Sequence, residues 1–377
     1  MRIGINALLL WGRFTGVERS IFNLLKAMMH LNTPHKFFVY LPIEFDISLL
    51  THTTNQVAPM RAVRLKVASR FRIMRILCEQ LYMPFRAALD GLHLLHCPGY
   101  VSILASPVPV VLTIYDILAI THPEWCRTAN RLYYRITLPI SIKRARRIIV
   151  PSETVKRELV SILSVSESKI DVVPLGVEER FFEPVNKSII CHLRQRLALP
   201  ERFILFVGNI EPKKNLPTLL EAYERLRRRM GNIGLVIVGA KAWGNGKLIE
   251  RAKSIGAQYL GYVSDNELHA IYHLASALVF PSLYEGFGLP PLEAMAVGTP
   301  VVASTGGALP EVLGDAALLV EPNDADAISE ALTAVLLDAS LRTALIERAR
   351  AHAAKFTWDE TARRVVQVYE RTLRECL

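Results

Sequence analysis

Paired cysteines are missing from the sequence. The five cysteines are scattered along the 377 residues, and no C-x-x-C pair occurs among Cys78, Cys97, Cys126, Cys191 and Cys376. This arrangement argues against a disulfide framework and against a cysteine zinc site, and it is typical of a protein that works in a reducing cytosol. We therefore predict a cytoplasmic protein.

Long apolar runs are missing as well. The richest stretch, 101–115, is interrupted by Pro107 and Pro109, so it is too short to span a bilayer. The apolar run at the amino terminus is too short for a secretory signal, and no small-residue cleavage site follows it. We interpret this run as a first buried strand.

Several recognition motifs do not occur. No G-x-G-x-x-G follows the first expected strand, which argues against a nicotinamide enzyme. The sequence has no zinc-finger spacing, no RNA-binding aromatic motif and no basic tail, so nucleic acid is not expected as a partner. The D-x-D at 324–326 follows a Pro-Asn pair and opens an expected helix, which favours helix capping over metal binding.

Acidic residues are scarce relative to basic ones in the first half of the chain. Residues 1–180 contain 23 Lys and Arg against 13 Asp and Glu, which accounts for the whole net charge of +10. Between 61 and 86, seven basic side chains alternate with apolar and aromatic ones, against the single acid Glu79. Such a segment suits an anionic membrane surface, which would hold the protein peripherally on the inner face of the plasma membrane. It is equally typical of an amphipathic surface helix with a solvated basic face.

Short β-branched runs alternate with longer helical patterns through most of the chain. The expected strands are 3–6, 37–41, 92–96, 108–114 and 147–150 in the first half, and 203–207, 235–238, 258–260, 277–280, 301–303 and 317–320 in the second. Alternation at this spacing predicts an α/β protein with parallel sheets. The alternation of strands and helices stops in a stretch with several Pro and Gly residues, which indicates a domain boundary. We predict a domain over 1–178, a linker over 179–199, a second domain over 200–357 and a final helix over 358–377.

The segment 281–302, PSLYEGFGLPPLEAMAVGTPVV, carries the strongest chemical signal. A strand is expected before it, and a proline-led helix begins inside it. Gly286 and Gly288 permit close backbone approach to a ligand, and the positive end of the helix then forms an anion site suited to a pyrophosphate. Glu285 in the loop and Glu293 in the helix are suited to accept hydrogen bonds from sugar hydroxyls. Taken singly, a solvated loop carboxylate and an ordinary first-turn acid explain them equally well.

This segment resembles the E-x7-E signature of family-4 glycosyltransferases, which have the GT-B fold. Five other segments agree with it, in the order that the family has them. They are FTGVERS (14–20), LTIYDILAITHPEW (112–125), VGNIEPKKNLPTLLEAY (207–223), and GALPEVLGDAALLVEPND (307–324) with FTWDETA (356–362). The resemblance implies two Rossmann-like domains whose parallel sheets face each other across a cleft. It also implies an acceptor side in the first domain, a nucleotide-sugar side in the second, and a last helix that crosses back to the first.

The resemblance also implies roles for single residues. Glu293 would bind the ribose hydroxyls of the nucleotide, and Glu285 would bind hydroxyls of the transferred sugar. Lys214 would contact the donor diphosphate, where a cation offsets charge growing on the leaving group. The donor-binding set is Gly16, Asn209, Lys213, Lys214, Glu285, Gly286, Phe287, Gly288, Leu289 and Glu293, and the catalytic set is Glu285, Lys214, Tyr115 and Asp116.

Two positions depart from the commoner family pattern. Asn209 stands where many members have arginine, and Lys213 is expected to supply the second positive charge. Tyr115 stands where many members have histidine, before Asp116. Tyrosine can donate a hydrogen bond but is a poor base at neutral pH, which argues against a general-base role at this position.

The segments EPKKN and EGFGLPPLEAM resemble the corresponding segments of bacterial mannosyltransferases of surface-polysaccharide assembly. We therefore predict a retaining transferase that moves mannose from GDP-mannose to a glycan or a lipid-linked saccharide. UDP-glucose, UDP-galactose and N-acetylhexosamine donors stay open. No cofactor and no catalytic metal are expected. The alternative functions are a nucleotide-sugar epimerase related to the GT-B enzymes, and a non-catalytic protein that binds nucleotide sugars.

Overall fold

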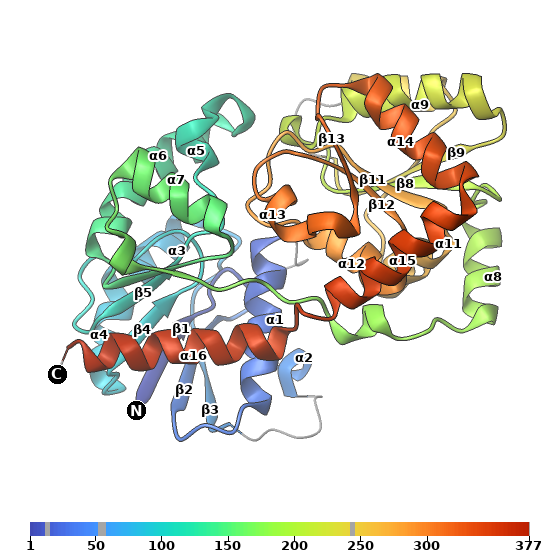
Figure 1. Ribbon diagram of the computed structural model, residues 1–377. Helices are drawn as coiled ribbons and strands as arrows, with labels where there is room; N and C mark the ends of the chain where they lie inside the picture. The colour runs from blue at the N-terminus through green and yellow to red at the C-terminus, as the bar shows by residue number, and fades with distance from the viewer. Residues whose placement is uncertain (12–15, 52–57, 242–245, 377) are drawn as a thin grey trace. The chain divides into compact units, whose positions relative to one another are not determined.

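The chain folds into two compact α/β units (Figure 1). The computed structural model describes residues 1–11, 16–51, 58–241 and 246–376. The first unit contains residues 1–176 and the last helix, α16 (Trp358–Arg374), whereas the second contains residues 177–357. Among the described residues, no helix is long and apolar enough to cross a membrane.

The first unit has a parallel sheet with the order β3-β2-β1-β4-β5-β6-β7 in the part of the chain that is described. Its strands are β1 (Arg2–Asn6), β2 (Lys36–Pro42), β3 (Met60–Leu65), β4 (Leu94–Cys97), β5 (Val110–Thr113), β6 (Arg147–Val150) and β7 (Ile170–Val172). Neighbouring residues of β2 point to opposite faces, as the period of a strand requires, and both faces are buried. Strands buried on both faces explain why the sequence showed apolar runs and not a polar alternation.

Helices cover both faces of this sheet. On one face lie α1 (Val17–His30) and α16, and on the other lie α4 (Met83–Leu89), α6 (Thr128–Arg144) and α7 (Glu153–Leu163). A buried chain of hydrogen bonds anchors α16 to the sheet. The Tyr369 hydroxyl lies 2.7 Å from His96 Nδ1, and His96 Nε2 lies 2.8 Å from the Thr113 hydroxyl. Burial lowers the pKa of His96 to about 3, so this histidine is neutral in the folded protein.

The basic segment 61–86 is not one helix. Its first residues form the edge strand β3, and its remainder forms α3 (Arg72–Leu77), a π-helical turn η1 (Cys78–Tyr82) and α4. The helical part carries eight large apolar side chains that are exposed to solvent, namely Phe71, Ile73, Met74, Leu77, Leu81, Tyr82, Phe85 and Leu89. The segment is therefore an amphipathic helical surface beside a sheet edge.

The second unit has a parallel sheet with the order β10-β9-β8-β11-β12-β13, again within the described residues. Its strands are β8 (Phe203–Val207), β9 (Gly234–Val238), β10 (Gln258–Gly261), β11 (Ala277–Phe280), β12 (Val301–Ser304) and β13 (Leu318–Val320). Helices α9 (Leu216–Met230) and α14 (Ala325–Leu337) pack with the sheet into one buried core. The unit also contains α10 (Gly246–Ser254), α11 (Asp265–Leu274), α12 (Leu289–Val297), α13 (Leu309–Leu313) and α15 (Ala339–Ala353).

Residues 179–199, predicted as a linker, are folded. They form the short helix η4 (Glu179–Phe182) and α8 (Lys187–Arg196), and they group with the second unit. Phe181 is fully buried, with its ring centroid 5.4 Å from that of His269 and 5.8 Å from that of Tyr272. Pro184 therefore separates two short packed elements, and the buried ring of Phe181 anchors the chain to the second unit.

Candidate active site

The site lies where the strand order reverses. In the second sheet the chain runs from β8 outward to β9 and β10, and then returns to the other side of β8 with β11. In open α/β sheets, ligands bind at the carboxyl ends of the strands beside such a reversal. Lys213 and Lys214 follow β8, and Glu285 follows β11. The topology thus brings the loops that carry these predicted residues together at one edge of the sheet.

Lys214 and Glu285 form a buried ion pair. The Lys214 Nζ donates to Glu285 Oε1 at 2.5 Å, and both side chains are almost fully enclosed. The Nζ also lies 4.6 Å from the ring centroid of Phe280, the last residue of β11. Burial alone would raise the pKa of Glu285, but the charges of Lys214 and Lys213 outweigh it and hold that pKa below its usual value. Glu285 is therefore a carboxylate at neutral pH.

Backbone hydrogen bonds fix the loops around this pair. The Leu283 N–H donates to the Lys213 carbonyl at 2.7 Å, and the Ala308 N–H donates to the Glu285 carbonyl at 2.8 Å. Gly307 adopts φ +63°, and a Cβ built there would lie 2.4 Å from the Glu285 carbonyl oxygen. The loop after β12 therefore supports the backbone of Glu285, and only glycine fits at the point of contact.

The loop after β8 depends on a second close approach. Gly208 adopts φ +156°, and a Cβ on Gly239 would lie 1.9 Å from the Gly208 carbonyl oxygen. Asn209 lies in this loop, half-buried, and its carbonyl accepts the Glu211 N–H at 2.8 Å. The structure therefore places Asn209 on the same loop as Lys213 and Lys214, where the family pattern more often has arginine.

Glu293 lies on α12 and has its own anchor. The Tyr272 hydroxyl donates to Glu293 Oε2 at 2.9 Å, and both residues are buried. Gly286, Phe287 and Gly288 are buried in the loop that leads into α12, and Gly288 is its N-cap at φ +121°. The N-cap Gly288 has no side chain with which to cap the amino end of α12, which begins at Leu289. A helix start of this kind, at the end of the loop that carries Glu285, is suited to an anionic ligand.

The remaining predicted residues lie in the first unit, at the carboxyl ends of β1 and β5. Gly16 is the N-cap of α1 at φ +51°, and a Cβ there would meet nothing within 4 Å. Phe14 and Thr15 of the FTGVERS block lie outside the described residues. Tyr115 and Asp116 follow β5.

Tyr115 is held in the protonated state. Burial, and then the charge of Glu18, raise the pKa of Tyr115 far above its usual value. Its ring centroid lies 5.7 Å from that of Tyr100, whose hydroxyl donates to Asp116 Oδ2 at 3.1 Å. Tyr115 can therefore donate a hydrogen bond, and it cannot act as a base near neutral pH.

Several residues around these sites were not predicted. Tyr272 lies within α11, and no sequence signal marks it as the partner of Glu293. Tyr100 adopts φ +66°, a rare conformation for a residue other than glycine, but strain of this kind is visible only in the backbone. Asn6, at the end of β1, donates to the buried Glu79 at 3.2 Å, and Glu79 lies in the π-helical turn η1. Burial raises the pKa of Glu79.

The D-x-D at 324–326 caps a helix, as predicted. The Asp324 side chain accepts the Ala327 N–H at 2.9 Å at the start of α14. Within the described residues, no group of three or more His, Cys, Asp or Glu could hold a metal ion. The expectation that transfer needs no metal and no cofactor stays a prediction.

Comparisons with known proteins identify the family of this chain. The family model for Glycosyltransferase Family 4 matches residues 14–181, and the model for Glycosyl transferases group 1 matches residues 192–352. O-antigen chain mannosyltransferase B of Escherichia coli is 34% identical over 266 residues, which are 69% of this chain and 70% of that one. The chain belongs to glycosyltransferase family 4. This family-4 glycosyltransferase is also 29% identical to the serotype-specific mannosyltransferase WbdA of Escherichia coli over 74% of its own length, which is 36% of the longer relative.

Solved structures confirm the GT-B fold of this family-4 glycosyltransferase. WaaG, a glycosyltransferase involved in lipopolysaccharide biosynthesis, matches with a TM-score of 0.73 at 17% identity, over 98% of this chain and 99% of that one. HepE of Anabaena, in complex with UDP-glucose, matches with a TM-score of 0.75 at 17% identity, over 98% and 100% of the two chains. At this identity the two structures bear on the fold alone.

Proposed function

We propose that this glycosyltransferase moves mannose from GDP-mannose to a glycan or a lipid-linked saccharide, with retention of the anomeric configuration. The observation that carries the proposal is the buried Lys214–Glu285 pair at the reversal of the second sheet, next to the start of α12. The mannosyltransferase relatives support the choice of sugar. HepE, which has been solved with UDP-glucose, supports a nucleotide sugar as the donor class.

The donor site follows from the charges of the second unit. Lys214 has three N–H donors and gives one to Glu285, which leaves two for the oxygens of the donor diphosphate. Backbone N–H groups around Phe287 and Gly288 complete the proposed diphosphate site, because they lead into the positive end of α12. Glu285 then accepts hydrogen bonds from the sugar, and Glu293 accepts them from the ribose.

Charge that develops on the leaving diphosphate is offset by Lys214, and Lys213 and the α12 amides add to this effect. Tyr115 of the first unit is not a base, because burial keeps it protonated. We therefore expect the acceptor proton to pass to an oxygen of the departing phosphate. On the resemblance to the family, we also expect Gly16 and Asp116 of the first unit to take part in the reaction.

Transfer of labelled mannose from GDP-mannose to a lipid-linked saccharide extract tests the proposed function. We expect a labelled product whose new linkage has the anomeric configuration of the donor, as read by proton NMR. Incubation of the donor alone tests the epimerase, because only an epimerase would convert the sugar without an acceptor. Donor binding without turnover across a broad acceptor panel would instead support a non-catalytic binding protein.

We further propose that the protein acts in the cytosol, attached peripherally to an anionic membrane through residues 61–89. The helical part of this segment exposes apolar side chains, and Ile73 and Leu81 are 74% and 72% exposed. Arg61, Arg64 and Lys66 on the adjoining edge are exposed as well. Exposed apolar groups beside basic ones suit the boundary between lipid head groups and acyl chains.

A further inference from the structure

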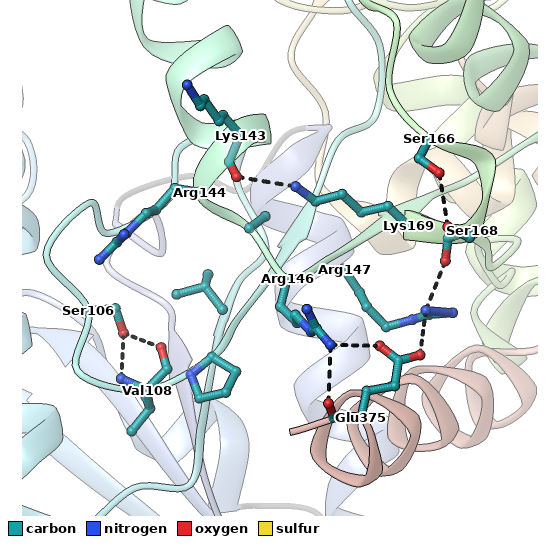
Figure 2. A pocket seen from close by; sticks show the side chains of 13 residues that line it. Ser106, Val108, Lys143, Arg144, Arg146, Arg147, Ser166, Ser168, Lys169 and Glu375 are labelled. Carbon is teal, nitrogen blue, oxygen red and sulfur yellow. Dashed lines mark hydrogen bonds and ion pairs between the residues drawn. The ribbon is translucent and has the colours of Figure 1, made fainter. Parts of the chain in front are cut away.

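The first unit contains a pocket at the edge of its sheet opposite to Tyr115 and Asp116. The pocket lies at the amino ends of β5, β6 and β7, beside the last turn of α6 (Figure 2). Its volume is about 730 Å³, and it lies entirely within the first unit. Since the predicted site residues follow the carboxyl ends of the strands, the proposed transfer reaction does not use this pocket.

Basic side chains dominate the lining. Of the 13 lining residues, five are basic (Lys143, Arg144, Arg146, Arg147 and Lys169), and Glu375 alone is acidic. Three serines add hydroxyl groups. A concave surface with this surplus of positive charge attracts anions.

Two of the five cations are built into the wall. Arg147 is buried, and its guanidinium donates to both carboxylate oxygens of Asp171, at 2.8 and 3.3 Å. The Lys169 Nζ donates to the carbonyls of Ile142 and Lys143, at 2.6 and 3.3 Å, and so neutralises the carboxyl end of α6. These hydrogen bonds hold Arg147 and Lys169 in the wall of the pocket. Because Lys169 offsets the partial negative charge at the carboxyl end of α6, that helix end does not repel an anion in the pocket.

The other three cations are available to a ligand. Lys143 and Arg144 are exposed, and within the described chain neither side chain has an acidic partner. Arg146 is half-exposed and lies 3.8 Å from Glu375, whose carboxylate also accepts from Arg147 at 3.0 Å. The Glu375 carboxylate therefore pairs with both Arg146 and Arg147, so the pocket retains unbalanced positive charge.

We propose that this pocket binds a phosphate group. A phosphate carries up to two negative charges and several acceptor oxygens, whereas a carboxylate carries one charge and two oxygens. A phosphate is therefore the better match for Lys143, Arg144 and Arg146 and for the nearby serine hydroxyls. Guanidinium groups suit phosphate oxygens because their N–H groups form a planar fork.

The surface next to the pocket offers one source of that phosphate. Leu132, Ile136 and Ile140 are exposed at four-residue intervals on α6, so they form one row along the helix that ends near Lys143. An apolar row that leads to a phosphate pocket suits a phospholipid, with the head group in the pocket and the row against the acyl region. A soluble phosphate or diphosphate would use the same cations without the row.

The test uses the full chain with Lys143→Glu/Arg144→Glu. Its matched control is Lys187→Glu/Arg228→Glu, which makes the same charge change at exposed positions of the second unit. Both variants and the wild type are titrated with pyrophosphate by calorimetry and sedimented with phosphatidylglycerol vesicles. Thermal melting checks that each variant folds, and Lys143→Gln/Arg144→Gln replaces the test variant if it does not.

We expect the test variant to bind at least one of the two probes at least tenfold more weakly than the control does. Loss of pyrophosphate binding identifies a soluble phosphate as the ligand, and loss confined to vesicles identifies a lipid head group. Equal binding of both probes by the test and control variants would overturn the proposal. Lys214→Ala removes pyrophosphate binding at the proposed donor site and leaves the pocket intact. Loss of binding at one site is therefore distinguishable from loss of binding at the other.

Discussion

At the scale of single residues, the proposed donor site contains two buried carboxylates, and each accepts a hydrogen bond from a buried side chain. Glu285 is paired with Lys214, and Glu293 accepts a hydrogen bond from Tyr272. Glu285 and Glu293 were predicted because a strand end, a glycine loop and a helix start mark their positions, and Lys214 was predicted from the resemblance to the family. It could not predict Tyr272, because the register of one helix against another is set by packing and not by any local signal.

Lys214→Ala should destabilise the protein in a pH-dependent manner. The lowered pKa of Glu285 means that its carboxylate stabilises the wild type above the ordinary pKa of a glutamate, and that this stability is lost as the pH falls. Without Lys214 the buried carboxylate is destabilising, by about 3 kcal/mol at pH 7, and protonation relieves it. Denaturant unfolding at pH 7 and pH 5 should show a smaller difference between wild type and variant at pH 5. Lys214→Ala/Glu285→Gln should recover most of the lost stability, and a difference that is independent of pH would refute this account of the pair.

Tyr272→Phe should weaken donor binding with little effect on turnover. The substitution removes the hydroxyl that positions Glu293, and a hydrogen bond to a charged group contributes about 1.5–3 kcal/mol. We expect KM for the donor to rise about tenfold. Tyr223→Phe is the matched control, because its hydroxyl donates to the Ile233 carbonyl at 3.1 Å in the same unit. If the two variants had the same KM, Tyr272 would have no role in positioning Glu293.

At the scale of elements, the strands of the second unit were predicted more closely than those of the first. Strands β8 and β11 have the predicted bounds, because each is a short apolar run between clear turn signals. Strand β3 was missed, since its two basic residues, Arg61 and Arg64, on a sheet edge resemble an exposed helix. Helix α8 was missed because the prolines around it suggested a linker.

The loop after β12 should tolerate no side chain at Gly307. Gly307→Ala combines a left-handed backbone, at a cost of about 1 kcal/mol, with a Cβ only 2.4 Å from the Glu285 carbonyl oxygen. We expect an additional loss of at least about 1 kcal/mol in the free energy of unfolding, together with loss of transfer activity. Gly231→Ala is the control, because φ is +70° there and nothing lies within 4 Å of the added Cβ. Equal unfolding free energies for the two variants would show that the contact with Glu285 is unimportant.

At the scale of the whole molecule, the surplus of positive charge lies in the first half of the chain, and the structure divides it among separate surfaces. Arg72 stacks 4.2 Å from the Tyr133 ring, and Arg86 pairs with Asp90 at 3.0 Å, so part of the basic segment stabilises the fold. The sequence showed the positive charge. It did not show which basic side chains are stacked on a ring or paired with an acid, because those partners lie far away along the chain or on the same helix turn.

Membrane attachment should therefore depend on apolar side chains as well as on charge. Ile73→Asp/Leu81→Asp should reduce sedimentation with phosphatidylglycerol vesicles at least tenfold, since it removes two exposed apolar groups and adds two negative charges. Ile189→Asp/Leu337→Asp, at exposed apolar positions of the second unit, is the matched control. High salt should weaken the binding of the wild type, because it screens exposed charges. Equal partition of the wild type onto neutral and anionic vesicles would count against the attachment.

In the proposed function, the second unit binds a nucleotide sugar through Lys214 and the carboxylates around it. Calorimetric titration with GDP-mannose, and with UDP-glucose as a second nucleotide sugar, measures this binding. We predict binding at one site, stronger for GDP-mannose, and at least tenfold weaker in Lys214→Ala, which corresponds to about 1.4 kcal/mol. Lys187→Ala, at an exposed position of the same unit, should bind as the wild type does. Absence of binding with every nucleotide sugar, or equal binding by Lys214→Ala and the wild type, would contradict the claim.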